Sequence, residues 1–518
     1  MSYSILIKNG TVIDGSGAAP IKADVAITGN HISDIGNLEG AGAAKVIDAT
    51  GKYISPGFVD LTSHSDTYGT IFSNPAQESM LAQGVTTSLF GNCGESLAPI
   101  VKKESMTGLN RWLTESQINT DWNSTSEYYE ALSELRPGLN IATLIGQNAL
   151  KRSANNAEEM ALLLEAAMRD GAWGLSSNFS FTTEGQYLSA ETLKLLEIVK
   201  SADGLYKIHL QDEGKNFLPA LASVVDFARR SKVRTVVSHF KVMGKGAWKD
   251  FSKAIKIIDT AREGGVEIYF DFFPYASAGS MLLNILPVWA REGDDETVLK
   301  RLFDKNTAEQ IITSLQQQTL HPERILIVSA KNDKKNVGKT LQDIAEHVSM
   351  APEAVILEIL KINDLNVTFL GKTISPKNII FAARYKESML ASDGAGYSLD
   401  FKKFGDLVHP RSFGAFPRFW NKIAPKAGLS HEEAIHKMTQ LPAKILGLTD
   451  RGLLRKNFIA DIAVFDMEGF RDRATYKTPF QFADGMRYVL VNGQLAKADN
   501  GALGARFARN GAALRKKA

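Results

Sequence analysis

The sequence alternates between short apolar runs and longer amphipathic stretches, and this alternation limits the folds open to the chain more than any other feature. Continuous apolar runs are typical of strands that are buried on both faces of a parallel sheet. Between two of the runs, Phe217, Leu221, Val224 and Ala228 recur at the spacing of one helix face. We count eight runs, namely Phe58–His64, Thr86–Cys93, Asn140–Gly146, Gly171–Ser177, Leu205–Leu210, Arg234–Phe240, Glu267–Phe273 and Glu387–Asp393.

Eight strand–helix units predict an α/β protein built on a (β/α)8 barrel of the TIM type, with a doubly wound sheet as the alternative. We expect this barrel to span residues 58–444. The stretch before the eighth strand is too long for one helix, so residues 284–378 are expected to form an insertion that is able to cover the barrel mouth. A strand-like run, Arg324–Ser329, lies within the insertion.

Both ends of the chain predict short strands separated by turn residues. Asn9-Gly10, Gly29-Asn30 and Asn492-Gly493 are turn signals, and the first of them predicts a hairpin. We expect residues 1–57 and 445–500 to form one small β domain. The β-rich runs are Tyr3–Lys8, Asp24–Thr28, His31–Ile35, Ala460–Phe465 and Tyr488–Val491.

The last residues, 501–518, form a basic tail in which Ala505–Ala518 is rich in alanine. Such a composition predicts a solvated helix with frayed ends.

Length and charge exclude several classes of protein. With 518 residues the chain is long enough for a large barrel and a smaller companion domain. A net charge of +3 is too small, at this size, to argue for a nucleic-acid or membrane partner. The single cysteine, Cys93, permits no intrachain disulfide, and neither a secretion signal nor a membrane span is evident. We therefore expect a cytoplasmic protein that acts on a small molecule, with its oligomeric state left open.

Three of the predicted strands end in residues that suit a metal ion. The second ends in Gly91-Asn92-Cys93-Gly94, the fifth in His209 and the sixth in His239. Barrel enzymes carry their chemistry at the carboxyl ends of the strands, so these side chains should converge. A thiolate and two imidazoles are ligands that Zn²⁺ prefers, and three protein ligands leave a fourth position open, as in catalytic sites.

Two further strands end in candidate catalytic residues. The eighth strand ends in Ser392-Asp393-Gly394, and an aspartate there is able to take a proton from water and return it to a leaving amine. The first strand ends near His64, which is a candidate metal ligand, a donor to the substrate oxygen or a structural residue.

Several longer motifs resemble those of a known family. The chain is similar to the amidohydrolase superfamily, and more closely to its N-acyl-D-amino-acid deacylases, the D-aminoacylases. The resemblance covers nearly the whole chain. It rests on ILIKNGTVIDGSG, PGFVDLTSHSD, GNCG, KIHLQDEG, VVSHFKVMG, DFFPYASAGS, ASDG, HPRSFGAFPRFW and RGLLRKNFIADIAVFD.

The resemblance implies a (β/α)8 barrel with a small β domain made from both chain ends. It also implies roles for individual residues, with Asp393 as the catalytic aspartate. Zinc would be held by Cys93, His209 and His239. The carboxylate of the substrate would meet four residues, namely Lys241, Arg411, Tyr275 and Ser280.

The chain departs from the family pattern at the end of the first strand. The family has His-x-His there, and these two histidines help to hold a second, weaker metal. Here the motif reads Thr62-Ser63-His64, and a hydroxyl is a poor zinc ligand. We therefore predict one zinc ion per chain, with the second site weak or absent. Loops that shape the substrate site also differ, at 146–148, 181–184 and 393–409.

The function that these features predict is zinc-dependent hydrolysis of a linear amide in an N-acyl amino acid-like substrate with a carboxylate. A cyclic-amide hydrolase, an acyl-transferring or amide-forming enzyme, and a degenerate barrel with a binding role are the alternatives.

Overall fold

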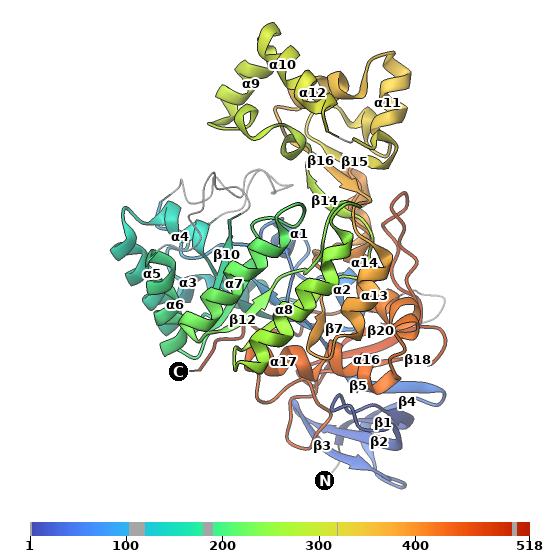
Figure 1. The fold of residues 1–518 in the computed structure, drawn as a ribbon. Coiled ribbons are helices and arrows are strands. Elements are labelled where there is room, and N and C mark those ends of the chain that lie inside the picture. The colour runs from blue at the N-terminus through green and yellow to red at the C-terminus, as the bar shows by residue number, and fades with distance from the viewer. Residues whose placement is uncertain (1–2, 103–119, 180–189, 319, 500–504, 518) are drawn as a thin grey trace.

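The computed structural model describes residues 3–102, 120–179, 190–318, 320–499 and 505–517 (Figure 1). Within these residues, the centre of the molecule is a barrel of eight parallel strands when β8 and its continuation β9 are counted together. The barrel strands are β6 (Phe58–Asp60), β7 (Val85–Phe90), β8 (Asn140–Thr143), β9 (Ile145–Gly146), β10 (Gly174–Asn178), β11 (Leu205–His209), β12 (Arg234–Val237), β13 (Ile268–Phe272) and β17 (Ser388–Leu390).

The barrel is closed between its last and first strands. Ser63 and Gly394 form a parallel bridge just beyond β6 and β17. Two backbone hydrogen bonds reinforce this bridge, from His64 N to Gly394 O at 2.7 Å and from Asp393 N to Thr62 O at 2.9 Å. The predicted barrel is therefore confirmed and the doubly wound alternative is wrong.

Amphipathic helices surround the barrel because each buries one apolar face against the strands. In α7, for example, Phe217, Leu221, Val224 and Ala228 are all buried, as their spacing predicts. The helices outside the insertion are α1 (Thr70–Ser73), α2 (Glu78–Leu81), α3 (Thr125–Leu135), α4 (Gln147–Ser153), α5 (Ala157–Arg169), α6 (Ala190–Ser201), α7 (Phe217–Ser231), α8 (Phe251–Glu263), α13 (Pro376–Arg384), α14 (Arg411–Arg418), α15 (Ala424–Ala427), α16 (His431–Met438) and α17 (Gln440–Leu446).

The two chain ends combine in a separate sheet, in the order β21-β20-β19-β18-β5-β1-β2-β3, with β4 paired to β1. Residues from both ends share its core, which supports the expectation of one small β domain. We propose that its bounds follow those expected from the sequence, except that the sheet continues beyond residue 500 to β21. Its strands are β1 (Tyr3–Val12), β2 (Ile21–Thr28), β3 (His31–Gly36), β4 (Ala43–Asp48), β5 (Lys52–Pro56), β18 (Ile462–Asp466), β19 (Met486–Val491), β20 (Gln494–Asp499) and β21 (Ala505–Phe507).

The predicted hairpin at Asn9-Gly10 is wrong. The strand β1 runs through these residues, and its register with β2 shifts between Ile7 and Gly10. Asn9 adopts a φ of 64°, and its backbone N–H donates to Asp24 Oδ1 at 2.8 Å. The turn signal therefore marks a β-bulge, which also needs a residue that tolerates the left-handed conformation. The turns at Gly29-Asn30 and Asn492-Gly493 do connect paired strands.

The insertion before the eighth barrel strand has its own core. It begins at β14, slightly earlier than the sequence suggests, and its sheet has the order β14-β16-β15. Figure 1 shows it on the same side of the barrel as α1, which follows the carboxyl end of β6. It therefore lies on the side where barrel strands end. Its elements are β14 (Ala278–Met281), α9 (Asp295–Phe303), α10 (Lys305–Gln316), β15 (Ile325–Ala330), α11 (Leu341–Val348), α12 (Pro352–Ile362) and β16 (Val367–Gly371).

The expected frayed helix at the C-terminal end is wrong. After β21 the described chain is extended and packs beside β8 and the residues that precede β10. Ala513 forms a parallel bridge with Ile141, and Trp173 Nε1 donates to Leu514 O at 2.7 Å. Alanine-rich composition favours a helix locally, but here neighbouring backbone groups offer hydrogen bonds to an extended chain, and these prevail.

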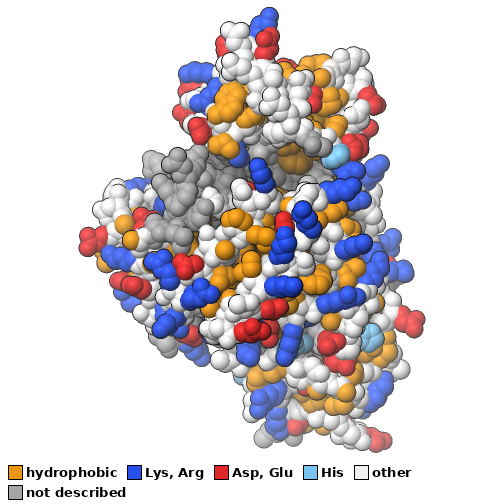
Figure 2. All heavy atoms as spheres, in the orientation of Figure 1, with side chains coloured by type: hydrophobic (Ala, Val, Ile, Leu, Met, Phe, Trp, Pro, Cys, Tyr) orange, Lys and Arg blue, Asp and Glu red, His pale blue; other side chains and the backbone are white. Residues whose placement is uncertain are grey.

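The surface agrees with the small net charge. On the face shown in Figure 2, basic and acidic side chains both occur over the barrel helices and the insertion. Among the described residues, no helix combines the length and the apolar character needed to cross a membrane.

Candidate metal centre and active site

Three side chains that follow different barrel strands converge at the mouth of the barrel. Cys93 lies in the loop after β7, His209 ends β11 and His239 follows β12. Their possible ligand atoms all lie within 4.8 Å of one another. Cys93 Sγ is 3.3 Å from His239 Nε2, and the rings of His209 and His239 have centres 4.5 Å apart. The structure thus brings together the three residues that the sequence singles out.

The donor set suits a zinc ion. Burial raises the pKa of the Cys93 thiol, but the charge of His239 and hydrogen bonds from three histidines outweigh burial and hold this pKa well below its usual value. The thiol is therefore prepared to ionise, and the thiolate is the form that binds metals. Two imidazoles beside a thiolate, with one coordination position left open, are typical of a catalytic zinc site.

The loop that carries Cys93 is held in a conformation that needs glycine on both sides. Gly91 and Gly94 have φ angles of 70° and 78°, and Cys93 itself has 54°. A Cβ on Gly91 would lie 2.0 Å from Leu144 O. The backbone N–H of Gly91 donates to Asp66 Oδ2 at 2.7 Å, and that of Gly94 donates to Ser176 Oγ at 3.0 Å. These contacts set the position of the thiol.

Asp393 lies beside this cluster, and both of its carboxylate oxygens have partners. His64 Nε2 is 3.1 Å from Oδ1, and Arg411 forms an ion pair with Oδ2. Burial raises the pKa of Asp393, but the nearby charges of Arg411, His239 and His64 outweigh burial and hold it well below the usual range. Asp393 is thus an ionised carboxylate in a buried site, and its pairing with Arg411 keeps it a weak base in this arrangement.

Lys241 points into the same region but is already paired. Its Nζ lies 2.6 Å from Glu213 Oε1 and 2.9 Å from His239 Nδ1. It also lies 6.0 Å from the centre of the Phe273 ring, and the guanidinium of Arg411 lies 4.9 Å from that ring. Two cations therefore border one aromatic ring at the mouth.

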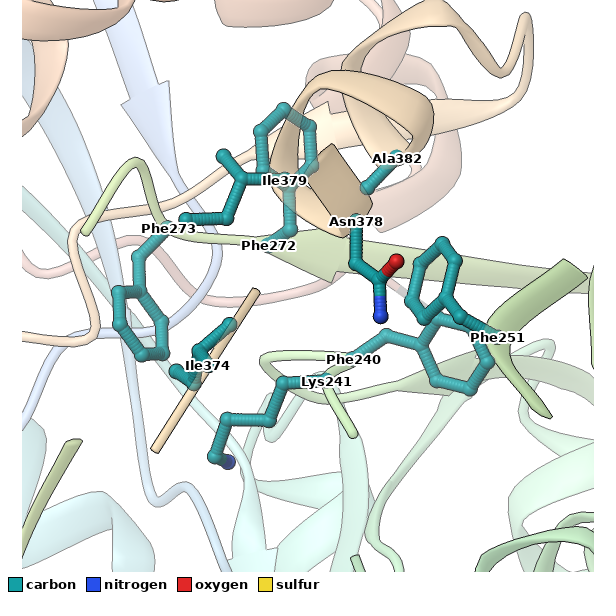
Figure 3. Close-up of a pocket in the computed structure, with 9 residues that line it drawn as sticks. All are labelled: Phe240, Lys241, Phe251, Phe272, Phe273, Ile374, Asn378, Ile379 and Ala382. Carbon is teal, nitrogen blue, oxygen red and sulfur yellow. The ribbon is translucent and has the colours of Figure 1, made fainter. Parts of the chain in front are cut away.

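An apolar wall stands behind Lys241 (Figure 3). The methylene chain of Lys241 borders a small pocket, and the amine of Lys241 points away from that pocket. This arrangement directs the charge of Lys241 toward the cluster. The pocket is lined by Phe240, Phe251, Phe272, Phe273, Ile374, Asn378, Ile379 and Ala382.

Tyr275 and Ser280, the other two residues predicted to bind the substrate, form hydrogen bonds with groups outside the Cys93 cluster. Tyr275 is 2% exposed, and its hydroxyl donates to Pro410 O at 3.3 Å. Ser280 lies on β14, at the base of the insertion, where its Oγ accepts from Asn284 Nδ2 at 3.0 Å. The structure therefore gives both residues partners other than the Cys93 cluster and Asp393.

Glu213 belongs to the site but was not predicted from the sequence. Its carboxylate lies 3.3 Å from His239 Nδ1 and 3.8 Å from His209 Nε2, in addition to its contact with Lys241. Burial raises its pKa, but the charges of Lys241 and His209 outweigh burial and keep Glu213 ionised. The sequence signal for Glu213 was its position four residues after His209, a candidate metal ligand. Such carboxylates orient ligand imidazoles.

The segment 181–184, one of the loops that differs from the family pattern, lies outside the described residues. Residues 147–148 begin α4, and Asn148 N donates to Gly94 O at 2.9 Å, next to Cys93. The loop 393–409 bridges the barrel and the insertion, because Leu407 N donates to Val328 O at 2.7 Å.

A closed barrel with a Cys-His-His cluster and a buried aspartate at its strand ends defines a metal-dependent hydrolase. Comparison with known proteins specifies the group. Residues 45–204 and 408–496 match the amidohydrolase family. The N-acyl-D-glutamate deacylase of Alcaligenes xylosoxydans xylosoxydans is 29% identical over 509 residues, which cover 94% of this chain and 92% of that protein.

Solved structures agree. The N-acyl-D-glutamate deacylase of Bordetella bronchiseptica, in complex with zinc and a phosphonate mimic of the tetrahedral intermediate, superposes with a TM-score of 0.82. It is 26% identical, and the match covers 99% of this chain and 100% of that one. A D-aminoacylase with a binuclear metal centre gives a TM-score of 0.81 at 27% identity, with the same coverage. These matches, which together extend over nearly the whole chain, support assignment to the amidohydrolase superfamily, and the chain is D-aminoacylase-like.

Proposed function

We propose that the protein is a zinc-dependent deacylase that hydrolyses the linear amide bond of an N-acyl-D-amino acid with a free carboxylate. The observation that carries this proposal is the convergence of Cys93, His209 and His239 beside the ionised Asp393. The relatives with the same barrel act, by their names, on N-acyl-D-glutamate, and this supports both the amide and the D configuration.

We infer that one zinc ion is held by Cys93, His209 and His239. When bound there, zinc supplies Lewis acidity that polarises the amide carbonyl and makes water more acidic. Thr62 is a poor ligand for a second ion, since its hydroxyl oxygen accepts from Lys207 Nζ at 2.6 Å and its proton is donated to Asp271 Oδ2 at 2.8 Å. One metal per chain is therefore our proposal.

Asp393 is the general base and acid in this proposal. Its carboxylate accepts the proton of the attacking water and later delivers it to the nitrogen of the leaving amine. His64 positions this carboxylate through the contact at Oδ1, and its hydrogen bond with Cys93 places it beside the proposed zinc ligands, where it donates to the substrate oxygen. Burial of Asp393 excludes bulk water from the proton transfer.

The substrate carboxylate binds Lys241 and Arg411, because an ammonium and a guanidinium fork are its natural partners. Binding has to compete with the present ion pairs, Lys241 with Glu213 and Arg411 with Asp393. A carboxylate that draws Arg411 away from Asp393 also makes that aspartate a stronger base. Tyr275 and Ser280 are proposed to complete this subsite after a change of partner.

The use of the only cysteine as a metal ligand suits a reducing compartment, and we place the enzyme in the cytoplasm. Its partner is a small molecule.

The first test is zinc per chain by elemental analysis, on protein purified without chelator, together with a panel of N-acyl amino acids. We expect about one zinc per chain and release of the free D-amino acid. Cys93→Ser should lose both zinc and activity. Protein that is folded, free of metal and inactive on the whole panel would favour the degenerate barrel, and turnover confined to cyclic amides would favour the cyclic-amide alternative.

A further inference from the structure

A fully buried ion pair lies directly beneath the proposed metal centre. The side chains of Lys207 and Asp271 are both 0% exposed, with Nζ 2.8 Å from Oδ2. Lys207 also donates to Thr62 Oγ1 at 2.6 Å and to Leu61 O at 2.5 Å. An ammonium has three protons, so every donor of this buried cation is used.

This ion pair is connected to the site above it. The second oxygen of Asp271 accepts the backbone N–H of His239 at 2.5 Å. His239 has a φ of 39°, which the hydrogen bond helps to maintain. On the other side, the backbone oxygen of Thr62 accepts from Asp393 N at 2.9 Å. Asp271 and Thr62 thus support a proposed metal ligand and the proposed base.

We propose that the Lys207 ammonium is a built-in cation that takes the place of a second metal ion and limits this site to one. The inference rests on the proposed function, since it concerns the same centre. The D-aminoacylase structure with a binuclear centre shows that a related barrel holds two ions. In this protein the Lys207 ammonium occupies the space beside Thr62 and pairs with the Asp271 carboxylate there.

The charges explain why a second ion is excluded. Asp271 is neutralised by Lys207 and has no oxygen left over, because one accepts from His239 and the other from Thr62 and Lys207. A divalent ion in this place would meet a fixed ammonium at close range, in a buried medium that screens little. Removal of the ammonium alone would leave a buried, unpaired carboxylate, which a metal ion is able to satisfy.

The experiment compares zinc content in four variants after gel filtration at one defined concentration of free zinc. They are Thr62→His, Lys207→Ala, the Thr62→His/Lys207→Ala double variant, and the control Lys437→Ala. Lys437 is another buried lysine, 4% exposed, that donates to the backbone oxygens of Lys386 and Ser388 at 3.1 and 3.2 Å, away from the proposed centre. It controls for the general effect of deleting a buried ammonium.

We expect about one zinc in wild type, Thr62→His and Lys437→Ala, and about two in the double variant, since three protein ligands and a vacated cation position allow a second ion. Lys207→Ala alone should also gain zinc, more weakly. A second ion in Thr62→His with Lys207 intact would overturn the proposal. So would a folded double variant that stays at one.

If the double variant does not fold, titration of the wild-type protein with Co²⁺ measures how many metal ions each chain binds. The first equivalent should give the absorption of a cobalt thiolate and be lost in Cys93→Ser. Saturation at one equivalent supports the proposal, whereas a second equivalent that disappears in His64→Ala overturns it. Absence of the first equivalent would instead refute the proposed function, so the two failures are distinguishable.

Discussion

At the scale of single residues, three of the proposed site residues share an unusual backbone conformation. Cys93, His239 and Asp393 all have positive φ angles, of 54°, 39° and 51°. Such conformations cost non-glycine residues on the order of 1–3 kcal/mol each and persist only where neighbours enforce them. The hydrogen bonds from His239 N to Asp271 and from Asp393 N to Thr62 do so here. Each of these three residues lies just after a barrel strand, where the chain leaves the barrel.

Replacement of Asp393 by asparagine should abolish proton transfer but leave the metal bound, because Asp393 is not among the three proposed ligands. We expect kcat to fall by about 10²–10⁴-fold, the usual contribution of a general acid–base group. Steady-state kinetics and zinc analysis measure the two effects. Asp400→Asn, an exposed change in the same loop, is the matched control. Near-normal turnover in Asp393→Asn would remove Asp393 from the mechanism.

Replacement of Lys241 by methionine should weaken binding of the substrate carboxylate. Charge-assisted hydrogen bonds contribute about 1.5–3 kcal/mol, so kcat/KM should fall by about 10–100-fold for N-acyl amino acids. Substrates with the carboxylate converted to an amide should lose much less. Lys245→Met, at an exposed position after the same strand, controls for general effects. Equal losses on charged and neutral substrates would argue for a structural role through Glu213.

At the scale of elements, the site is a set of strand ends and the loops that leave them. In the loop after β7, three residues adopt positive φ angles, namely Gly91, Cys93 and Gly94. Its glycines are explained by geometry, because a side chain on Gly91 would collide with the backbone after β8. The position of the thiol is therefore coupled to the packing of two neighbouring strands.

Gly91→Ala should move this loop and weaken zinc binding. The left-handed conformation costs alanine about 1–2 kcal/mol, and the overlap with Leu144 O adds a cost of about 1–3 kcal/mol. We expect a lower melting temperature and less than one zinc per chain. Gly29→Ala is the control, since Gly29 also has a positive φ, 61°, but nothing within 4 Å of its Cβ position. Equal effects of the two changes would mean that the collision is unimportant.

At the scale of the whole molecule, the C-terminal end of the chain packs against the barrel beside β8 and the residues that precede β10. The final segment acts as an added strand-like brace. Leu514 N donates to Ile141 O at 2.7 Å, Ile141 N donates to Ala512 O at 2.9 Å, and Lys516 N donates to Gly171 O at 2.8 Å. The side chain of Lys516 also lies 5.8 Å from the centre of the Trp173 ring. These contacts join the last residues to β8 and to the chain before β10.

Deletion of residues 511–518 should destabilise the barrel without removing its chemistry. Each lost hydrogen bond contributes about 0.5–1.5 kcal/mol, so the sum is on the order of a few kcal/mol. Thermal unfolding should shift to lower temperature, while zinc content and kcat of the folded fraction stay close to those of the full chain. Deletion of residues 517–518 alone is the control. An unchanged melting temperature would show that the brace is dispensable.

The sequence by itself determined the barrel, the eight strands and the identity of the residues at their ends. Apolar periodicity is local, and the rule that parallel strands present their carboxyl ends at one side is general. Together they place Cys93, His209, His239 and Asp393 in one region without knowledge of any distance.

Only the tertiary structure decided the partners of the charged residues. The pairing of Arg411 with Asp393, of Lys241 with Glu213 and of Lys207 with Asp271 joins different strands and loops. Sequence spacing does not encode such contacts, because they depend on which side chains meet inside the closed barrel. The extended conformation of the C-terminal segment also depends on tertiary structure. Its backbone forms hydrogen bonds with backbone groups of the barrel, and these outweigh the preference of alanine for a helix.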